Sequence, residues 1–206
     1  MTENHEGPGL SEADLGPDPI AGFLAWIEDA RAAGIAFPGA AALATADADG
    51  RPAVRHVLVK VVDARGFTFF TNRESRKGRH LASNPHAALA VYWREIDRQV
   101  CITGTAAPIA DEESAAYFGT RPREARIGAW ASLQSRPVGS REELDAAYAE
   151  MQARFPGDDV PLPPHWGGYW LEPDTIEFWK GREHRLHDRF RFIRGGDGWR
   201  LERLWP

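Results

Sequence analysis

The sequence predicts a mainly β fold, a small antiparallel β-barrel with peripheral helices, and three observations lead to this fold class. Short runs of apolar and β-branched residues recur along the chain, separated by turn signals such as DADG at 47–50 and GDG at 196–198. Amphipathic helical patterns are few and lie before or between these runs. The Gly-rich fingerprint of a dinucleotide-binding parallel sheet is not present. Strands therefore dominate, and the helices are expected at the periphery.

The chain divides into an N-terminal arm and one domain. Residues 1–17 are polar, contain Gly and Pro, and have no periodicity, so we expect a mobile arm. Residues 18–206 contain no internal repeat, low-complexity block or convincing linker. A chain of 206 residues with 43% hydrophobic content can bury a core of ordinary size, so residues 18–206 are expected to form a single domain.

The first elements of this domain are a helix and a meander of strands. Asp18 is a suitable N-cap, Pro19 stands at the first helical position, and Gly34 ends the helix. The apolar face of this helix is expected to contain Ile20, Phe23, Leu24 and Ile27. Three strands follow, with DARG at 63–66 as the second turn, in AALATA at 41–46, PAVRHVLVKVV at 52–62 and FTFFT at 67–71.

The remaining elements alternate between helices and strands. A short helix capped by Ser75 and stopped by Pro85 is expected in ESRKGRHLASNP at 74–85. Strands are expected at 87–95 and 98–109, and helices at 111–122 and 140–155, the second with a capping box of Ser140 and Glu143. After a Pro-rich loop, the chain is again strand-rich in YWLEP at 169–173, TIEFWKG at 175–181, RFRFIRG at 189–195 and WRLERLW at 199–205.

Composition restricts the partners of the chain. A net charge of −5 argues against a general nucleic-acid or anionic-membrane binder. The single cysteine, Cys101, excludes a disulfide or a cysteine zinc site within one chain and fits a reducing compartment. His184 and His187 belong to a turn and a strand without a third ligand nearby, so no metal is expected. Since no apolar run approaches the roughly 18 residues of a membrane span, we expect a cytoplasmic protein.

Four separated clusters combine basic donors with aromatic or hydroxyl side chains: RHVLVK at 55–60, SRKGR at 75–79, YFGTRPR at 117–123 and RLHDR at 185–189. Each is either solvated surface or part of an anion site. In SRKGR, Arg76 and Lys77 stand at an expected helix N-terminus, an arrangement that suits a phosphomonoester. Arg55 and Lys60 differ in strand parity, so their side chains are expected on different faces of the strand. Each could then bind a separate phosphate.

The segment RLHDRFRF at 185–192 has two possible interpretations. In an extended chain, Arg185, His187 and Arg189 would share one face, with no acidic residue of the same parity between them. The opposite face would carry Leu186, Asp188, Phe190 and Phe192. Such a cationic row is either a solvated edge strand or the wall of a binding site.

Several long motifs recur in a specific order: RHVLVK, FFTNRESRKGR, YWREIDRQV, YFGTRPREARIGAWASLQS, HWGGY, IEFWKGREHRLHDR and WRLERLWP. In this order, over roughly residues 18 to 206, the chain resembles the pyridoxamine (pyridoxine) 5′-phosphate oxidase family. The resemblance implies a split β-barrel homodimer that binds FMN at the subunit interface. It also implies oxidation of pyridoxamine or pyridoxine 5′-phosphate by O2 to pyridoxal 5′-phosphate and hydrogen peroxide.

The resemblance also implies roles for individual residues. Lys60, Tyr117 and Arg121 would bind the substrate phosphate, and Arg185 and His187 would hold the substrate ring for catalysis. Gln134 and Ser135 would be expected to reach the flavin of the partner subunit. The flavin-contacting positions would be Arg55, His56, Val57, Leu58, Val59, Lys60, Phe70, Thr71, Arg76, Lys77, Gln99, Gln134, Ser135, Trp179 and Arg189.

Some of these residues also have simpler interpretations, and two departures from the family concern the substrate. Phe70 and Trp179 suit core aromatics, Gln99 a strand end, and Tyr117 a helix residue that packs inward. Ala125 stands where the family commonly has a serine that binds the substrate phosphate, and ENHEGPGL at 3–10 lacks the Arg and Tyr of relatives. The alternatives are therefore a related FMN oxidase of the phenazine type and a non-catalytic flavin- or B6-binding protein.

Overall fold

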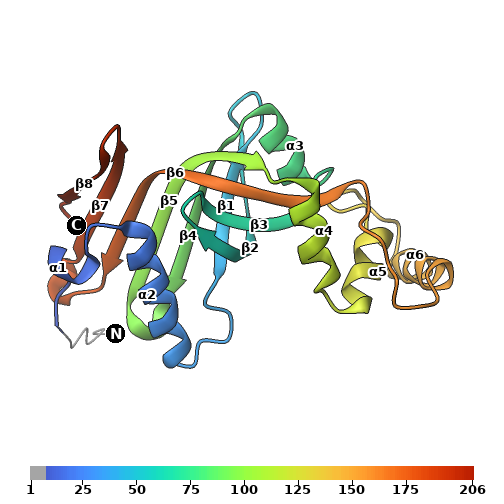
Figure 1. Ribbon diagram of the computed structural model, residues 1–206, viewed down its shortest axis with the longest axis horizontal. Helices are drawn as coiled ribbons and strands as arrows, with labels where there is room; N and C mark the ends of the chain where they lie inside the picture. Colours follow the sequence, from blue (N-terminus) through green and yellow to red (C-terminus); the bar gives the residue numbers. More distant parts are fainter. Residues whose placement is uncertain (1–7) are drawn as a thin grey trace.

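The structure is a computed structural model and describes residues 8–206 (Figure 1). Eight antiparallel strands form one sheet in the order β3-β2-β1-β4-β5-β6-β7-β8, and a further pairing of β3 with β6 closes the first six into a barrel. This confirms the predicted antiparallel barrel. The strands are β1 Ala40–Ala46, β2 Pro52–Asp63, β3 Gly66–Asn72, β4 His86–Trp93, β5 Arg98–Pro108, β6 Trp166–Lys180, β7 Asp188–Gly195 and β8 Gly198–Arg203.

Strand β6 connects the two parts of the sheet. Its first half, 166–171, pairs with β3 and closes the barrel, whereas its second half, 175–180, pairs with β7. The sequence predicted two strands here, which is wrong, because β5 pairs with both halves and joins them. The register shifts where Thr103 pairs with Thr175 and Gly104 with Pro173, so Asp174 forms a bulge that accommodates the proline.

The core lies inside the barrel and under helix α2, Pro19–Ala32. The Asp18 side chain accepts a hydrogen bond from the Ile20 amide, as the predicted N-cap requires. The Phe23 ring meets Phe67 edge-on at 4.9 Å between centroids, and Trp26 meets Phe178 at 5.0 Å. The predicted helix is confirmed except that Leu24, expected on the apolar face, is 42% exposed.

Helix α3, Arg76–Ser83, begins where it was predicted, and the Ser75 hydroxyl accepts a hydrogen bond from the Gly78 amide. This is N-capping, which satisfies one of the amides left open at a helix start. Ser75 itself is fully buried. The cap therefore fixes the N-terminus of α3 against the barrel.

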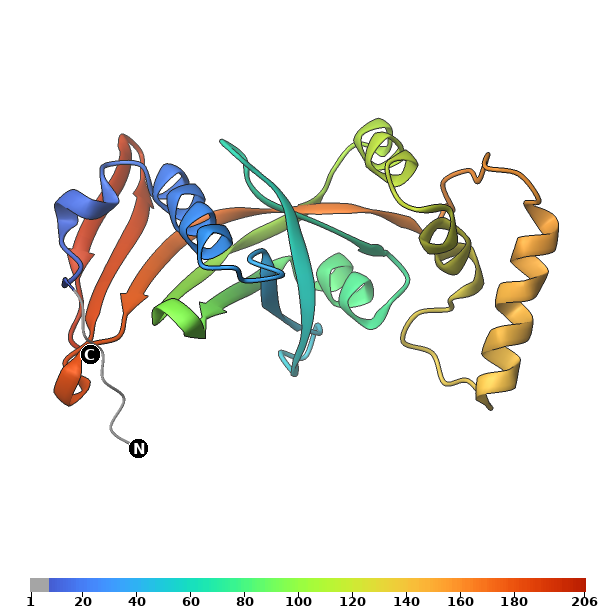
Figure 2. The same cartoon turned by 90° about the horizontal axis from the view of Figure 1, so that it is seen from below.

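Three helices between β5 and β6 project from the barrel on one side (Figures 1 and 2). They are α4 Asp111–Gly119, α5 Arg123–Ala131 and α6 Arg141–Arg154. The sequence did not predict α5, which follows Pro122 without a side-chain cap and buries only Ile127. The predicted capping box of α6 is incomplete: the Ser140 hydroxyl accepts from the Glu143 amide, but the Glu143 carboxylate accepts from the Gly139 amide instead.

The N-terminal segment is packed against the domain where the structure describes it. Residues 1–7 of the predicted mobile arm lie outside the described residues. The prediction is wrong for the part that follows, because α1, Glu12–Leu15, is helical and both Leu10 and Leu15 are buried. The Leu10 amide donates a hydrogen bond to the Asp188 carboxylate at 3.0 Å. Burial of two leucines and this long-range hydrogen bond hold the segment in place.

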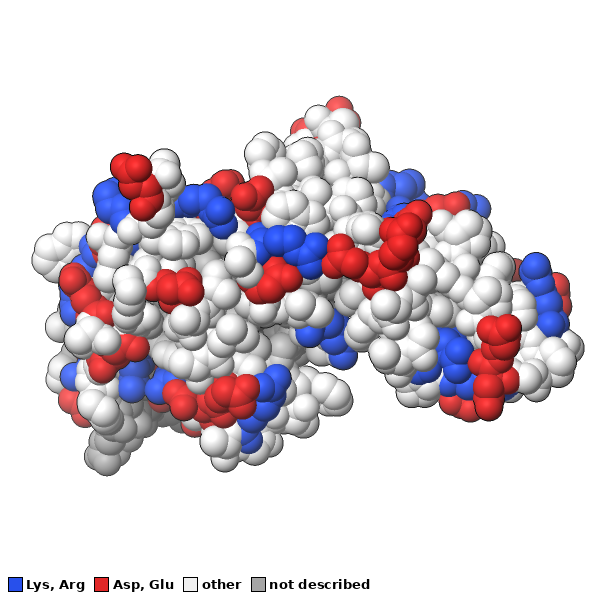
Figure 3. Space-filling view, in the orientation of Figure 1, with Lys and Arg blue, Asp and Glu red and all other residues white. Residues whose placement is uncertain are grey.

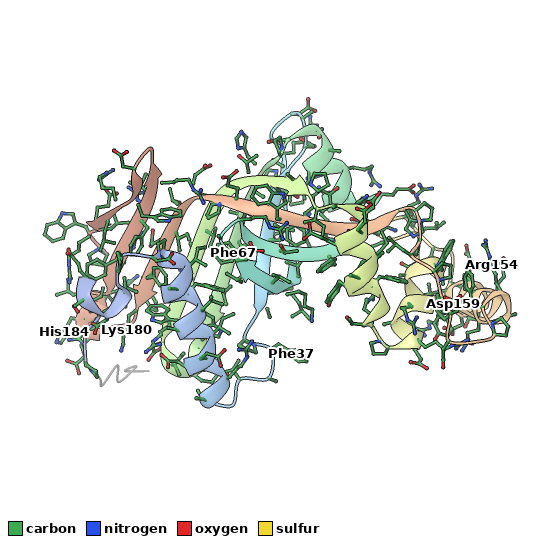
Figure 4. The ribbon with its side chains drawn as sticks, in the orientation of Figure 1. Phe37, Phe67, Arg154, Asp159, Lys180 and His184 are labelled. Carbon is green, nitrogen blue, oxygen red and sulfur yellow. The ribbon has the colours of Figure 1, made fainter. Side chains whose placement is uncertain are left out.

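The two ends of the molecule are far apart. Figure 4 shows Lys180 and His184 at one end and Arg154 and Asp159 at the other, with Phe67 between them inside the barrel. Figure 3 shows basic and acidic side chains intermixed on one face, and a hollow in the surface between the barrel and the helical projection. Among the described helices, none has the length and apolar character needed to cross a membrane.

Candidate active site

A cavity of about 480 Å³ lies between the barrel and α4, and we call it the basic cavity. Strands β2 and β3, the start of α3, helix α4 and the segment before α6 supply its walls. Ten of the predicted site residues line it, together with Thr120, Pro122 and Trp166, which the sequence did not assign to the site. The ten are His56, Val57, Leu58, Lys60, Phe70, Thr71, Lys77, Tyr117, Arg121 and Gln134.

Lys77 is a buried cation in this cavity, with only 8% of the residue exposed. Its ammonium donates hydrogen bonds to Gln134 Oε1 at 2.7 Å, Thr71 Oγ1 at 3.0 Å and Ser75 Oγ at 3.4 Å. Burial, and then the positive charge of Arg55, lower the pKa of Lys77 to about 8. Within residues 8–206 its hydrogen-bond partners are all neutral oxygens, so an anion would stabilise its charge.

Two arginines add to this positive charge. The Arg55 guanidinium donates to the Leu43 carbonyl at 3.0 Å and to Thr45 Oγ1 at 2.8 Å, and so it is fixed against β1. Burial and the neighbouring charge of Arg76 lower its pKa. Arg55 is half-buried whereas Lys60 is exposed, which confirms that they face different sides of β2. Arg55 of β2, together with Arg76 and Lys77 at the N-terminus of α3, thus forms a cluster of three cations suited to a phosphate.

Aromatic rings form the wall opposite these cations. Phe70 stacks on Tyr117 with 3.8 Å between ring centroids, and Trp166 stacks on the pair, 5.5 Å from Phe70. A Cβ at Gly168 would lie 2.9 Å from a Phe70 ring carbon, so glycine allows this stack. Phe70 and Tyr117 are both half-buried and line the basic cavity, so their stack forms part of its wall. The Trp-Gly-Gly pattern at 166–168 was the available signal for the missed Trp166.

Arg121 lies over this aromatic wall, with its guanidinium carbon 4.9 Å from the centre of the Trp166 ring. Burial lowers the pKa of Arg121. Its Nη1 is buried and makes no hydrogen bond within the described part of the chain. A guanidinium held by stacking, with a donor left open, is suited to binding an anionic group of a ligand.

The cavity continues into a smaller lobe of about 250 Å³ beyond Arg121 and Gln134. Small side chains of α5 form this lobe, and Ala125 is among them. The sequence missed the lobe because it did not predict α5. The other residues of its wall are Asn72, Gly128, Ala129, Ser132 and Trp166.

Gln134 belongs to the basic cavity of its own chain, where its amide oxygen accepts from both Lys77 and Thr71. Within its own chain Gln134 thus lies beside Lys77, and its expected reach to the flavin of the partner subunit stays a prediction. Ser135 follows in an exposed loop with a φ of +72°. Among the other predicted cofactor residues, Val59 packs its side chain against the core and donates its amide to the Gly39 carbonyl at 2.9 Å.

The remaining predicted site residues form a second group, here called the C-terminal group: Gln99, Trp179, Arg185, His187 and Arg189. Gln99, Trp179 and Arg189 are direct neighbours across β5, β6 and β7. The His187 ring lies 4.7 Å from Trp179, and its Nδ1 accepts a hydrogen bond from the Arg182 amide at 3.0 Å. These side chains thus meet at one end of the sheet.

The predicted cationic row on a strand is wrong in two respects. Arg185 lies in a 3-10 turn, η2 Glu183–Arg185, and β7 begins only at Asp188. His184 and Arg185 have φ values of +58° and +61°, a left-handed backbone that strand parity cannot anticipate. Arg189 is also not an open cation, because Glu177 on β6 binds it at 2.8 Å.

The basic cavity and the C-terminal group are on different parts of the molecule. Trp166 of the cavity and Trp179 of the C-terminal group stand at the two ends of β6, thirteen positions apart. At about 3.3 Å per residue, the strand separates them by roughly 43 Å. Side chains of one chain therefore cannot bring the two groups into contact, and a ligand could meet both only if a second copy supplied one of them.

The chain matches two family models. Residues 27–155 match the family described as pyridoxamine 5′-phosphate oxidase, and residues 166–206 match the pyridoxine 5′-phosphate oxidase C-terminal dimerisation region. Curated relatives named pyridoxine/pyridoxamine 5′-phosphate oxidase include one from Rubrobacter xylanophilus, 54% identical over 96% of this chain and 91% of the relative. Another, from Anaeromyxobacter dehalogenans, is 56% identical over 92% of this chain and 96% of the relative.

Solved structures agree with these matches. PhzG from Burkholderia lata, in complex with tetrahydrophenazine-1-carboxylic acid, superimposes with a TM-score of 0.89 at 37% identity, covering 96% of this chain and 98% of that one. A pyridoxamine 5′-phosphate oxidase-related, FMN binding protein from Nostoc punctiforme has the same fold, with a TM-score of 0.75 at 17% identity and coverage of 92% and 98%. The two family matches and the curated relatives together identify this chain as a member of the pyridoxamine 5′-phosphate oxidase family.

Proposed function

We propose that the protein is an FMN-dependent oxidase that converts pyridoxamine 5′-phosphate or pyridoxine 5′-phosphate, with O2, to pyridoxal 5′-phosphate and hydrogen peroxide. The observation that carries this proposal is the buried Lys77, whose described hydrogen-bond partners are neutral and whose charge is reinforced by Arg55 and Arg76. An anion beside a buried cation of this kind offsets the cost of its burial. The phosphate of FMN is such an anion.

Two sets of anion-binding groups lie in or beside the basic cavity, as a phosphorylated cofactor and a phosphorylated substrate together require. The inner set is Lys77 with Arg55 and Arg76, at the N-terminus of α3. The outer set is Lys60, Tyr117 and Arg121, on β2, α4 and the turn that follows it. We assign the inner set to the FMN phosphate and the outer set to the substrate phosphate. The open Nη1 of Arg121 supports the second assignment.

A homodimer would complete the site. The matched C-terminal dimerisation region supports this assembly and contains Trp179, Arg185, His187 and Arg189. The outward face of the barrel supports it too, since Val54 on β2 is 69% exposed and Tyr92 on β4 is 55% exposed. We infer that the C-terminal group of one copy lies over the basic cavity of the other.

In this site the chain would position the reactants. Bound FMN would supply the redox chemistry by accepting a hydride from the substrate and passing electrons to O2. Lys60, Tyr117 and Arg121 would hold the substrate by its phosphate, so that its ring lies at a fixed distance from the flavin. Arg185 would face the substrate ring from the other copy, where its positive charge stabilises negative charge that develops during transfer.

An anaerobic titration tests the proposal. The purified holoprotein is mixed with pyridoxamine 5′-phosphate without O2, and the visible absorbance of the flavin is followed. We expect bleaching that recovers when O2 is added, with pyridoxal 5′-phosphate formed in more than one equivalent per flavin. A protein whose flavin never bleaches would contradict the proposed substrate, and one that stops after a single equivalent would be a binding protein.

A second candidate function is oxidation of a different aromatic acid. The similarity to PhzG, whose solved structure holds a tetrahydrophenazine carboxylic acid, favours this alternative. Ala125 favours it as well, because the lobe that it lines has no hydroxyl at this position for a phosphate. The same titration with a reduced phenazine carboxylic acid distinguishes the two, and we expect faster bleaching with the phosphorylated pyridine.

A further inference from the structure

Thr45 connects a cation of the inner set to helix α3. It lies on β1 and is only 3% exposed. Its Oγ1 accepts a hydrogen bond from Arg55 Nη1 at 2.8 Å. The same oxygen lies 3.2 Å from Nδ1 of His80, a buried histidine on α3. The three side chains therefore form one chain of contacts, from β2 through β1 to α3.

The direction of each hydrogen bond follows from the donors present. A guanidinium can only donate, so Thr45 Oγ1 is the acceptor toward Arg55. The hydroxyl has one hydrogen of its own, and His80 Nδ1 is positioned to accept it. If His80 donated instead, Oγ1 would accept twice and its own hydrogen would be buried without this acceptor, which is costly. Thr45 thus donates to His80 and accepts from Arg55.

This chain of contacts determines where the Arg55 guanidinium points. Its hydrogen bonds to the Leu43 carbonyl, at 3.0 Å, and to Thr45 both start from Nη1. Within residues 8–206, Nε and Nη2 of Arg55 make no hydrogen bond and stay available to an anion. Because the guanidinium is planar, fixing the direction of one N–H group fixes the directions of the others.

His80 also connects this support to the other two cations. It follows Lys77 by three positions on α3, so the two side chains share a face of the helix, and both are buried. Arg76 is near enough for its positive charge to lower the pKa of Arg55. Like charges repel, so cations that converge on one point need fixed supports. The contact between Thr45 and His80 supplies such a support between α3 and the strands.

We propose that Thr45 and His80 are positioning residues for the cofactor phosphate: Thr45 aims the Arg55 guanidinium, and His80 orients the Thr45 hydroxyl. The proposal rests on the proposed function, in which Arg55, Arg76 and Lys77 bind the FMN phosphate. Neither Thr45 nor His80 is among the residues that line the basic cavity, so both act through Arg55. The pair therefore contributes to recognition of the phosphate and not of the flavin ring.

Two ligands separate these contributions, because riboflavin has the flavin ring of FMN but no phosphate. The apoprotein is titrated with each ligand, and flavin fluorescence gives the Kd. We expect Thr45→Val and His80→Phe to raise the Kd for FMN about tenfold, as for a lost hydrogen bond, and to leave the Kd for riboflavin within about twofold of wild type. Thr45→Ser keeps the hydroxyl, and His80→Asn keeps an acceptor near the Nδ1 position. Both should bind FMN within about threefold of wild type.

Thr68→Val is the matched control, since Thr68 is another threonine of the barrel that is 3% exposed, on β3. It should change neither Kd. Equal losses for FMN and riboflavin in Thr45→Val, or unchanged binding of FMN, would overturn the proposal. Thr45→Val nearly preserves the shape of the side chain, so it decides the question even if His80→Phe does not fold.

Arg55→Met separates this proposal from the proposed function. We expect Arg55→Met to weaken FMN binding, and Thr45→Val to have no further effect when it is added to Arg55→Met. A further tenfold loss in the double variant would mean that Thr45 does not act through Arg55, and the positioning role would be wrong. If Arg55→Met bound FMN like wild type, the assignment of Arg55 to the phosphate would itself be wrong.

Discussion

The basic cavity and the C-terminal group differ in how their charges are compensated. In the cavity, Lys77 is buried beside Arg55 and, within the described residues, binds only neutral oxygens. In the C-terminal group, Glu177 binds Arg189, and the neighbouring Asp188 accepts from Arg203 and from the Leu10 amide. The first region is thus prepared for an anion. In the second, Arg189 is paired with Glu177, and the group offers a rigid arrangement of rings and donors.

This difference in charge compensation indicates that the two regions have different roles, one in phosphate binding and the other in positioning. A pocket with excess positive charge supplies binding energy for phosphate, which is the same for any phosphorylated ligand. A loop with a strained backbone supplies position, which differs between ligands. Since β6 separates the regions by roughly 43 Å within one chain, neither would complete the proposed site alone, and in the proposed dimer binding by one copy would be joined to positioning by the other.

The largest expected effect tests this division directly. Lys77→Met damages only the basic cavity, and the double variant Arg185→Ala/His187→Ala damages only the C-terminal group. In a mixed dimer one site carries both defects and the other carries none. If subunits are exchanged at random, half of the dimers are mixed, so the mixture should recover about a quarter of wild-type activity from two nearly inactive parents.

The control for this experiment is each variant dissociated and reassembled alone, which should stay as inactive as before. A mixture no more active than its parents, with mixed dimers demonstrated by two different affinity tags, would place each site within one chain. The idea that the basic cavity of one copy is completed by the C-terminal group of the other would then be wrong.

The next effect concerns cofactor affinity. Lys77→Met removes the buried ammonium, and we expect the Kd for FMN to rise by about a hundredfold, as for loss of a strong charge-assisted hydrogen bond. The apoprotein should unfold at no lower temperature than wild type, because a buried cation without an anion is itself unfavourable. Fluorescence titration of FMN and thermal unfolding of the apoprotein measure the two quantities.

Arg79→Met is the matched control, since Arg79 lies on the same helix, is exposed and donates to the Glu74 carbonyl. We expect its FMN affinity to stay within about twofold of wild type, as for other exposed charges. An equal loss in both variants would mean that the general charge of α3, and not the buried ammonium, attracts the phosphate.

Local signals explain how much of the fold the sequence predicted. The caps at Asp18, Ser75 and Ser140 act within one helical turn, so the helices after them began where expected. Helix α5 has no capping side chain and buries only Ile127, so its sequence gave too weak a pattern. The continuity of β6 through Pro173 depends on pairing with β5, a long-range contact that local patterns do not contain.

The candidate site was predicted unevenly for the same reason. The association of Arg76 and Lys77 with a helix N-terminus followed from the sequence alone, and the structure places both there. The row of Arg185, His187 and Arg189 did not, because a strand was assumed where the backbone turns left-handed at Arg185. Most other site residues were predicted from the family resemblance, and even this did not indicate that Gln134 lies beside Lys77 in its own chain.

A smaller effect follows from the pKa of Lys77, lowered to about 8 from its ordinary value of 10.5. Between these values the native apoprotein binds fewer protons than the unfolded chain, so its stability should rise with pH over that window. A bound phosphate dianion reverses this by favouring the charged ammonium. The Kd for FMN should therefore be nearly constant between about pH 6.5 and 7.5 and rise by about tenfold between pH 7 and 9.

Titration of FMN at a series of pH values measures this dependence. Lys77→Met should bind weakly at every pH, with no comparable rise above pH 8. If wild type showed the same affinity at pH 7 and pH 9, the phosphate would not depend on the Lys77 charge, and Arg55 and Arg76 alone would account for binding.

The smallest effect separates phosphate binding from positioning within the basic cavity. Ala125 lies in the small lobe next to Arg121, whose Nη1 has no hydrogen-bond partner within residues 8–206. Ala125→Ser would place a hydroxyl there, and a new hydrogen bond to a substrate phosphate should lower KM for pyridoxamine 5′-phosphate by up to about tenfold. Its kcat should change little, because the hydroxyl would contact the phosphate and not the reacting carbon.

Gly128→Ser is a matched control, since it adds a hydroxyl to the same lobe at a position that the resemblance does not connect with phosphate. A KM that rises in Ala125→Ser but not in Gly128→Ser would indicate that the lobe is shaped for a different substrate, and that the cavity shares the phosphate chemistry of its family only on the flavin side.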